Sequence, residues 1–199
     1  MNANTENDRF RILHNGIMPQ KGSVLISEPF LNDAYFQRAV IFLSGCDKDG
    51  AMGFVLNKET GLVLGDLTDS ITSERQTPVF LGGPVDGDKL FFLHSLGEFL
   101  PGALYIRDDI YLNGDFDVLQ SYMNQGNPIA GKIKFFLGYS GWSPGQLDEE
   151  IKSNTWLVGN LDFQSIMSGE REELWRKALS GLGKQYKVWL NYPKEPYLN

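Results

Sequence analysis

The stretch KIKFFLGYSGWSPGQLDEEIKSNTW, residues 132–156, contains the densest group of local structure signals in the chain. Its first five residues begin with polar/apolar alternation and end in an apolar run, which predicts a strand that enters a hydrophobic core. Gly138 and Gly141 then predict a sharp turn, because glycine adopts backbone angles that other residues resist. The stretch therefore begins as a strand that leads into a tight corner.

A capped helix is predicted after this corner. Ser143 is a favourable N-cap, Pro144 suits the first helical position, and Gln146 completes a capping box three residues after the cap. The first turns of the helix carry carboxylates that meet the positive end of the helix dipole: Asp148, Glu149 and Glu150. The whole stretch thus predicts a strand, a turn and a helix.

The composition predicts one globular domain. The chain has 199 residues, of which 42% are hydrophobic and 13% aromatic, and this is enough for a substantial core. Its 22 glycines and nine prolines indicate many turns and short elements. We expect a disordered N-terminal tail at residues 1–15, one domain at residues 16–190 and a C-terminal tail at residues 191–199.

Cysteine usage and hydropathy predict a cytoplasmic protein. Cys46 is the only cysteine, so no disulfide can form within the chain, and this fits a reducing compartment. The first residues lack the apolar segment of a signal peptide, and no apolar run approaches the ~18 residues of a membrane helix. We therefore expect a soluble protein that does not associate with membranes.

The charge distribution argues against nucleic acid as a partner. The net charge is −7, from 25 acidic and 18 basic residues, whereas a protein that binds nucleic acid through its whole surface needs the opposite balance. Residues 1–130 hold 17 acidic and nine basic side chains, and residues 131–199 hold eight and nine. Any anion-binding surface is therefore expected in the C-terminal third.

The order of predicted elements indicates the α+β class. Strands are expected at residues 22–27, 39–43, 51–56, 78–81, 90–93, 104–106, 110–112 and 156–158. Helices are expected after a cap at Asn113 or Asp115 and from Glu170 to at least Leu179, with a short turn at residues 163–167. Since strands outnumber helices and do not alternate regularly with them, the pattern differs from that of a doubly wound sheet.

Five sequence blocks, in order, carry a resemblance to a known family. They are SEPFLNDAYFQRAVIFL (residues 27–43), DGAMGFVLNK (49–58), LGGPV (81–85), LH (93–94) and GYSGWSPGQLDEEI (138–151). With these blocks the chain resembles the AlgH/YqgE-like family of small bacterial proteins over residues 22–182. It departs from the pattern at Ser140, more often alanine, at Asp148, more often glutamate, and at Cys46-Asp47, where a histidine commonly precedes the Asp-Gly-Ala turn.

The resemblance mainly implies an architecture. It implies a single α+β domain in which a strongly bent, largely antiparallel sheet is flanked by helices. It implies no established biochemical activity. Some family members carry the label of transcriptional regulator, which comes from a genetic association and not from a recognised DNA-binding motif. If the histidine that this chain lacks is needed for chemistry, this chain does not share that chemistry.

His94 is the best candidate for a catalytic residue. It ends an apolar strand close in sequence to the Gly82-Gly83 turn, so it could act as a general base or a ligand. The alternative, which we favour, is a strand-end histidine bonded to the backbone. The candidate groove residues are Asn57, Gly82, Gly83, His94, Tyr139 and Trp142.

Other chemistry-bearing residues have simpler interpretations. Ser140 does not lie in a G-x-S-x-G motif, and Ser143 is expected to cap the helix. The three carboxylates after it splay around the helix, so a Mg²⁺ site is not expected. Two histidines and one cysteine are too few for a His/Cys metal site. We expect neither a metal nor a cofactor, and Cys46 is expected to be a turn or core thiol.

The last predicted helix offers one argument for anion binding. Arg176 and Lys177 lie opposite its apolar face, and Lys184 and Lys187 would join them if the helix continues through two glycines. Such a face could contact phosphate or an acidic partner. The solvent side of a docked amphipathic helix is the favoured interpretation, and no helix-turn-helix pattern is present.

Three hypotheses on function follow. The favoured one is a cytoplasmic, non-catalytic regulatory protein that binds a small molecule or a protein. The second is a small-molecule enzyme that uses His94 as acid or base. The third is direct DNA binding.

Overall fold

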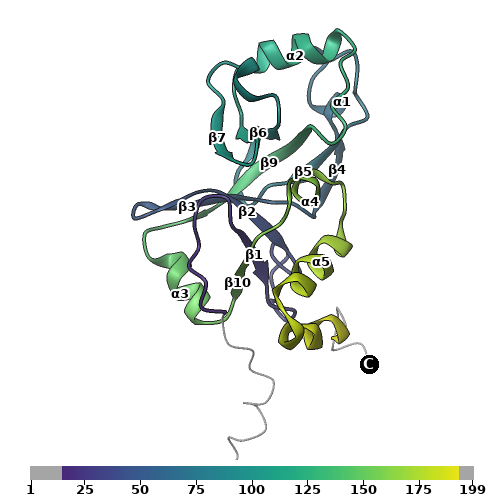
Figure 1. Cartoon of the computed structure of the whole chain (residues 1–199). Helices are drawn as coiled ribbons and strands as arrows, with labels where there is room; N and C mark the ends of the chain where they lie inside the picture. Colours follow the sequence, from purple (N-terminus) through teal and green to yellow (C-terminus); the bar gives the residue numbers. More distant parts are fainter. Residues whose placement is uncertain (1–14, 193–199) are drawn as a thin grey trace, which may run out of the picture.

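The structure, a computed structural model, describes residues 15–192 and has an α+β fold (Figure 1). Its sheet is largely antiparallel and contains ten strands, as the class prediction requires. The strands are β1 Val24–Ser27, β2 Val40–Asp47, β3 Gly50–Val55, β4 Glu59–Val63, β5 Pro78–Leu81, β6 Val85–His94, β7 Leu104–Arg107, β8 Ile110–Leu112, β9 Ile133–Trp142 and β10 Trp156–Gly159.

Five α-helices and two 3₁₀ helices are assigned within the described residues. The α-helices are α1 Leu64–Leu67, α2 Phe116–Asn124, α3 Gln146–Lys152, α4 Phe163–Met167 and α5 Glu172–Leu182; the 3₁₀ helices are η2 Gly97–Phe99 and η3 Lys184–Asn191. Asp115 caps α2, because its carboxylate accepts hydrogen bonds from the amides of Asp117 and Val118. None of these helices combines the length and the apolar character that a membrane span requires.

Strand β9 joins the two halves of the sheet. The strand order is β10-β1-β2-β3-β9-β6-β8-β7, and β5 pairs with β9 and with β4. The first half of β9 lies between β5, to which it is parallel, and β6, whereas residues Ser140–Trp142 pair with β3. Figure 1 shows β9 running from the upper half of the molecule, under α2, toward the lower half with β1, β2 and β10.

The predicted turn at Gly138 and Gly141 is wrong, because β9 continues through both glycines. Gly138 has φ of +67°, and a Cβ there would lie 2.6 Å from the carbonyl oxygen of Gly83. A Cβ on Gly82 would lie 2.0 Å from the carbonyl oxygen of Gly138. These glycines therefore allow the connection from β5 to β6, at Gly82 and Gly83, to cross the middle of β9 at backbone contact.

The chain turns only after β9, at residues 143–145. Gly145 has φ of +77°, and α3 begins at Gln146, so the prediction that Ser143 is the N-cap is wrong. One half of the predicted capping box is present, since the Gln146 side-chain oxygen accepts a hydrogen bond from the Ser143 amide at 3.0 Å. Pro144 precedes the helix and does not occupy its first position.

Both faces of the sheet are covered. In the lower half, Val24 and Ile26 of β1 belong to the hydrophobic cluster that includes Trp175 of α5, whereas Leu25 belongs to the cluster with Ile151 of α3. Since successive strand residues face opposite sides, α3 and α5 cover opposite faces of β1. In the upper half, a third cluster packs under α2. This two-sided burial explains the uninterrupted apolar runs of the strands.

The remaining differences from the predictions are local. β4 was not predicted, and β6 begins five residues before the predicted strand at residues 90–93. Residues 1–14 and 193–199 of the predicted tails lie outside the described residues. The Asn15 side chain donates to the carbonyl of Val158 at 2.5 Å, and the Tyr192 carbonyl accepts from Arg38 at 2.6 Å. Ordered contacts therefore extend slightly beyond residues 16–190 at both ends.

Candidate functional site

A buried lysine lies on β9 among apolar side chains. Ile133 and Phe135 face the cluster under α2, whereas Lys134 shares the opposite face with Phe136 and is only 3% exposed. Long charged side chains are almost never fully buried unless their charge is partnered. Lys134 is therefore the residue of β9 whose position most needs an explanation.

The Lys134 amino group is held at the end of α4. Its Nζ donates to the carbonyl oxygens of Ile166 at 3.3 Å and Ser168 at 2.5 Å. It also lies 4.2 Å from the ring centroid of Phe80 on β5. Carbonyls at a helix C-terminus and an aromatic face both stabilise a cation. The lysine thereby connects the sheet to the segment between α4 and α5.

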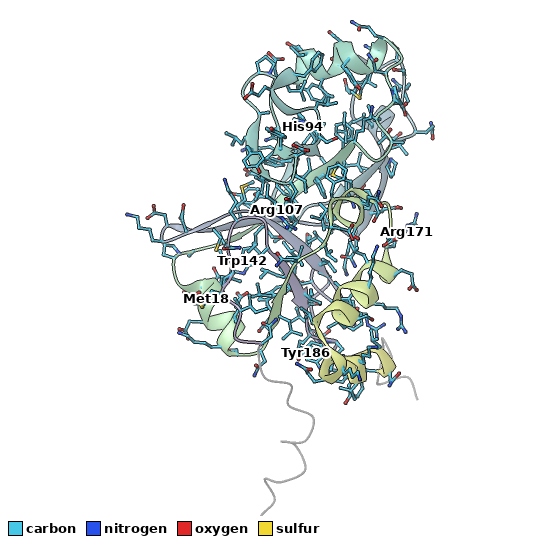
Figure 2. The ribbon with its side chains drawn as sticks, in the orientation of Figure 1. Met18, His94, Arg107, Trp142, Arg171 and Tyr186 are labelled. Atoms are coloured by element: carbon cyan, nitrogen blue, oxygen red, sulfur yellow. The ribbon has the colours of Figure 1, made fainter. Side chains whose placement is uncertain are left out.

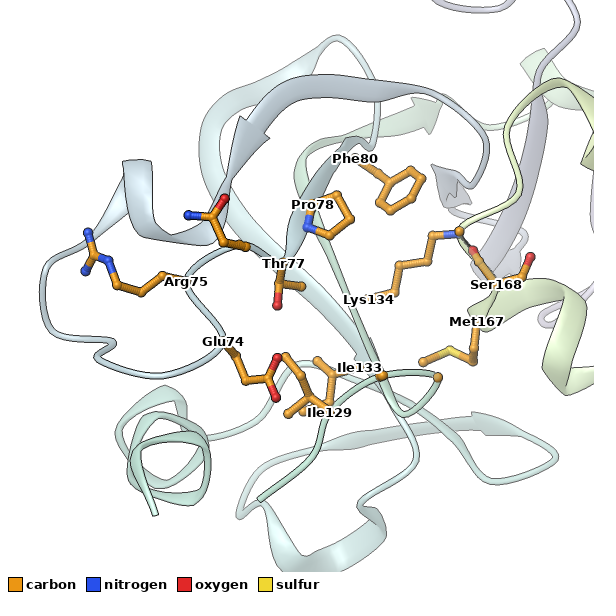
Figure 3. Close-up of a pocket in the computed structure, with 14 residues that line it drawn as sticks. Glu74, Arg75, Thr77, Pro78, Phe80, Ile129, Ile133, Lys134, Met167 and Ser168 are labelled. Atoms are coloured by element: carbon orange, nitrogen blue, oxygen red, sulfur yellow. Dashed lines mark hydrogen bonds between the residues drawn. The ribbon is translucent and has the colours of Figure 1, made fainter. Parts of the chain in front are cut away.

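A cavity of about 460 Å³ adjoins this lysine (Figure 3). It lies between the segment leading into β5, the segment leading into β9 and the end of α4. Its walls are mainly apolar, and the apolar residues among them include Pro78, Phe80, Ile129, Ile133 and Met167. We call this space the Lys134 cavity. Its size and apolar lining are typical of small-molecule sites.

Lys134 is a cationic residue of the cavity wall, and its Nζ lies beside the ring of Phe80, which also lines the cavity. Arg75 also lines it, but its guanidinium donates to the carbonyls of Gly65 at 2.7 Å and Ile71 at 2.9 Å. Figure 3 shows the Arg75 side chain extending away from Lys134, while the lysine chain crosses toward Ser168. The polar chemistry of the site therefore centres on one amine.

The pKa of Lys134 is lowered from its ordinary value of 10.5 to about 7. Burial is the largest cause, because a charge is poorly solvated there, and the carboxylates of Glu170 and Glu59 act in the opposite direction. Glu59 is itself paired with Arg171, whose Nη2 lies 2.5 Å from its Oε2. Near neutral pH the amine is therefore present both with and without its extra proton, and such perturbed groups in clefts are candidates for function.

His94 is fully buried and both of its ring nitrogens are bonded to the backbone. The amide of Leu96 donates to Nδ1 at 3.2 Å, so the proton lies on Nε2, which donates to the carbonyl of Asn113 at 2.7 Å. Burial lowers its pKa, and this favours the neutral ring. With this geometry no ring nitrogen remains for a substrate, and His94 locks β6 to the turn after β8.

Asn57 also has its polar atoms occupied by the backbone. Its side-chain oxygen accepts from the amide of Val40 at 2.9 Å, and its amide nitrogen donates to the carbonyl of Arg38 at 2.9 Å. It is buried, with 7% exposure. This side chain therefore holds the start of β2 and does not face a groove.

Four of the predicted groove residues lie at two adjoining features that meet at Tyr139. Gly82 and Gly83 contact the backbone of Gly138 and Tyr139 at the strand crossing. Tyr139 and Trp142 line a wide, open depression of about 620 Å³ together with the β2–β3 hairpin. Figure 2 places His94 in the upper half of the molecule, far from Trp142 in the lower half. The predicted set therefore does not form one site.

Comparison with known proteins identifies the family. The sequence profile of the AlgH-like family matches residues 24–187. The chain belongs to the AlgH-like family. It is 49% identical over 191 residues to a "UPF0301 protein" of Parabacteroides distasonis, covering 96% of each chain, and 45% identical to one of Bacteroides fragilis, covering 100% of each chain. The resemblance inferred from the five sequence blocks is thus confirmed.

Solved structures support the same assignment. The solution structure of the AlgH protein from Pseudomonas aeruginosa matches with a TM-score of 0.70 and 28% identity, over 88% of this chain and 98% of that one. A crystal structure of a protein from Corynebacterium diphtheriae matches with a TM-score of 0.71, over 91% of this chain and 95% of that one. At 16% identity the second match shows a shared fold alone.

The most distinctive block of the AlgH-like pattern in this chain, GYSGWSPGQLDEEI, has structural partners in the fold. The Glu150 carboxylate accepts from the indole nitrogens of Trp142 at 2.8 Å and Trp156 at 2.7 Å. Gln146 donates to its other oxygen at 2.9 Å. Glu150 thereby fixes α3 against β9 and β10, so a predicted dipole contact is in fact a link between two buried tryptophans.

The contacts of Ser140 and Cys46 also indicate structural rather than chemical roles. The Ser140 hydroxyl is fully buried and donates to the carbonyl of Gly82 at 3.1 Å, which strengthens the strand crossing. Cys46 is half-buried with its Sγ 3.8 Å from the carbonyl of Pro19. Burial first, and then the nearby Asp148 and Asp47, raise the pKa of the Cys46 thiol. A thiol with a raised pKa is a poor nucleophile at neutral pH.

The basic face expected on the last helix is smaller than predicted. α5 ends at Leu182, and Gly183, with φ of +131°, separates it from the helix η3, which begins at Lys184. Lys184 and Lys187 therefore do not extend the face of α5. Arg176 is half-buried and donates to the carbonyl of Leu190 at 3.1 Å, so it holds η3 against α5.

No metal site is indicated within the residues that the structure describes. Over residues 15–192 no group of three or more His, Cys, Asp or Glu side chains converges in a way that could hold a metal ion.

Sequence reasoning missed Lys134. In the run Lys132-Ile133-Lys134 the lysines follow the alternation of a strand with one solvated face. The signal that could have singled out Lys134 is the following Phe135-Phe136 pair, since an apolar run on both faces indicates that the solvated face has ended. α4, which covers Lys134, is about 30 residues later in the chain, and the sequence around β9 does not indicate that α4 packs there.

Proposed function

We propose that this AlgH-like protein is a cytoplasmic, non-catalytic ligand-binding protein with a regulatory role, and that its ligand occupies the Lys134 cavity. The ligand has a small apolar body and one oxygen acceptor, a carboxylate or a carbonyl, that meets Lys134 Nζ. The observation that carries this proposal is the buried amine at the wall of a mainly apolar cavity.

The energetics of Lys134 support a binding role. A buried amine costs free energy, and a neutral side chain of similar length would fill the same space without that cost. An acceptor oxygen of a ligand would compensate this cost, and apolar walls would add about 25 cal/mol for each Å² of ligand surface removed from water. One polar anchor in an apolar pocket is the usual composition of a specific small-molecule site.

The surroundings of the cavity favour binding over catalysis. An enzyme that both removes and returns a proton commonly uses an acid and a base placed within hydrogen-bond reach of one substrate. Lys134 is the one strongly perturbed group among the described residues that line the cavity, and Glu74, which also lines it, is exposed. His94 lies elsewhere with both ring nitrogens bonded to the backbone.

A regulatory role fits the contacts of the amine. The neutral amine has two N–H donors, both used by carbonyls in the α4–α5 segment, so a ligand acceptor that takes one of them competes with those contacts. Binding would thereby change the position or stability of α4 and α5, whose surface a protein partner can recognise. The label of transcriptional regulator on some relatives then reflects an indirect effect, and not contact between this chain and DNA.

The experiment is a thermal-shift titration with hexanoate, which combines a carboxylate with a short apolar chain. Wild type and the exposed control variant Lys132→Met are expected to gain thermal stability with increasing hexanoate, whereas Lys134→Met is not. A ligand at 100 times its Kd adds about 2.7 kcal/mol to the apparent stability. An equal shift in Lys134→Met, or no shift in wild type with hexanoate or its aldehyde, would contradict the proposal.

Direct DNA binding is tested separately by gel shift at low salt. The net charge of −7 and the small basic face of α5 predict no binding. A complex whose affinity falls steeply with added salt would instead support a DNA-binding function.

A further inference from the structure

The hydrogen bonds of Lys134 use only the N–H donors of its neutral amine and leave the nitrogen lone pair for nucleophilic attack. A lysine ammonium has three N–H donors, whereas the neutral amine has two N–H donors and a lone pair. Two carbonyl acceptors, those of Ile166 and Ser168, lie within 3.3 Å of Nζ. Both acceptors remain satisfied when the third proton leaves, and the lone pair is then available to an atom in the cavity.

We propose that Lys134 captures an aldehyde or ketone with a short apolar chain, through an imine between Nζ and the carbonyl carbon. This inference rests on the proposed function, since it names the chemical class of the ligand that occupies the Lys134 cavity. It adds that binding is covalent and reversible. Of the two ligand groups, a carboxylate and a carbonyl, only the aldehyde or ketone carbonyl combines an oxygen that accepts a hydrogen bond with a carbon that an amine can attack to form an imine.

The step balances with the amine and the carbonyl compound alone. The Nζ lone pair forms a bond to the carbonyl carbon, and the carbonyl π electrons move to oxygen. The two hydrogens of the neutral amine then leave with that oxygen as one water molecule, and a C=N bond remains. No oxidant, reductant or metal takes part, and attack by water reverses the step.

The environment makes this lysine more reactive than the others. At pH 7 about half of an amine with a pKa near 7 is neutral, against roughly one part in 3,000 for an unperturbed lysine. The cavity walls, which include Phe80 and Ile133, also limit access of the water that reverses the step. Both effects favour Lys134 over the exposed Lys132.

Imine formation has a structural consequence. A neutral imine has no N–H, and a protonated one has a single N–H, so at least one of the carbonyls of Ile166 and Ser168 loses its donor. Capture of a carbonyl compound therefore loosens the contact between β9 and the α4–α5 segment. The covalent step is thus the means by which the ligand acts on that segment.

The test is reductive trapping of the full-length protein with hexanal. Hexanal is added at a stoichiometric amount at pH 7 with cyanoborohydride, and modified lysines are identified by peptide mass spectrometry. We expect the Lys134 peptide to be modified at least tenfold faster than that of Lys132, and excess hexanoate to suppress this reaction in wild type. Lys134→Arg, which keeps a cation at this position, is expected to show only the slow labelling of exposed lysines.

The outcomes separate this inference from the proposed function. If hexanoate stabilises wild type but hexanal labels only exposed lysines, the binding site stands and the imine is wrong. If neither compound acts at Lys134, both are wrong. Rapid labelling of Lys134 that hexanoate does not suppress would show a reactive amine that is not reached through the ligand site, and it would also overturn the inference.

Discussion

The strand crossing and the Lys134 cavity both involve strand β9, but they differ in how visible they are in the sequence and in what their residues do in the structure. The crossing, formed by Gly82, Gly83 and Gly138, lies in blocks that stand out in the sequence. In the structure its residues are explained by backbone contact and packing. Lys134 does not stand out in the sequence, yet it is the buried, perturbed group beside a cavity. A distinctive motif can thus reflect steric demands, while the residue that we propose as the functional one has an ordinary local pattern.

The largest expected effect comes from adding one methyl group at the crossing. In Gly82→Ala the new Cβ would lie 2.0 Å from the carbonyl oxygen of Gly138, so the backbone of β5 or β9 must move. We expect a loss of about 3–5 kcal/mol in the free energy of unfolding, measured by urea denaturation. In the control Gly87→Ala, on exposed β6, the Cβ meets no atom within 4 Å, so stability is expected to change by less than about 0.5 kcal/mol. Equal stability of the two variants would show that the crossing is not sterically tight.

The second effect tests whether the conspicuous carboxylates are structural. Glu150→Ala leaves the buried indole nitrogens of Trp142 and Trp156 without their acceptor. We expect a loss of about 2–3 kcal/mol, with thermal unfolding followed by tryptophan fluorescence. Glu149→Ala is the matched control, because the exposed Glu149 carboxylate pairs with the exposed Lys152, and this substitution should change stability by at most about 0.5 kcal/mol. A loss of stability for Glu150→Ala no larger than that for Glu149→Ala would remove the structural explanation of this motif.

The third expected effect is a pH dependence of the free energy of unfolding that is caused by Lys134. The pKa of Lys134 is about 7 in the folded protein and 10.5 when unperturbed, so between these values the unfolded chain binds more protons. Stability should therefore rise with pH over this range, by up to about 1.4 kcal/mol per pH unit, relative to Lys134→Met. The control Lys132→Met should keep the wild-type slope. Parallel pH profiles for wild type and Lys134→Met, from urea denaturation between pH 6.5 and 9, would show that Lys134 stays charged in the folded state.

Much of the fold could be predicted because its signals are local. The hairpin at residues 40–56, the strand β5 at Pro78–Leu81 and the cap of α2 at Asp115 depend on alternation, turn residues and capping within a few positions. The five blocks are also sufficient to identify the family, and the α+β class follows from the pattern of elements along the chain. Each of these features is determined by residues close to it in the sequence.

The features that could not be predicted depend on distant segments. Gly138 has the local character of a turn residue, and only the approach of Gly82 and Gly83, more than 50 residues earlier, shows that it serves a crossing. Lys134 has the pattern of a solvated strand residue until α4 covers it. The functional candidate was missed for the same reason that the turn was wrong: tertiary contact overrode a correct local signal.

The most direct test of the Lys134 cavity as the functional site is an NMR pH titration of protein carrying ¹³C-labelled lysine. We expect that one lysine Cε–Hε signal titrates near pH 7, that it is missing in Lys134→Met but present in Lys132→Met, and that it shifts when hexanoate or hexanal is added. If every lysine signal titrates near pH 10 and none responds to these compounds, Lys134 is an ordinary structural cation and the account of the site is wrong.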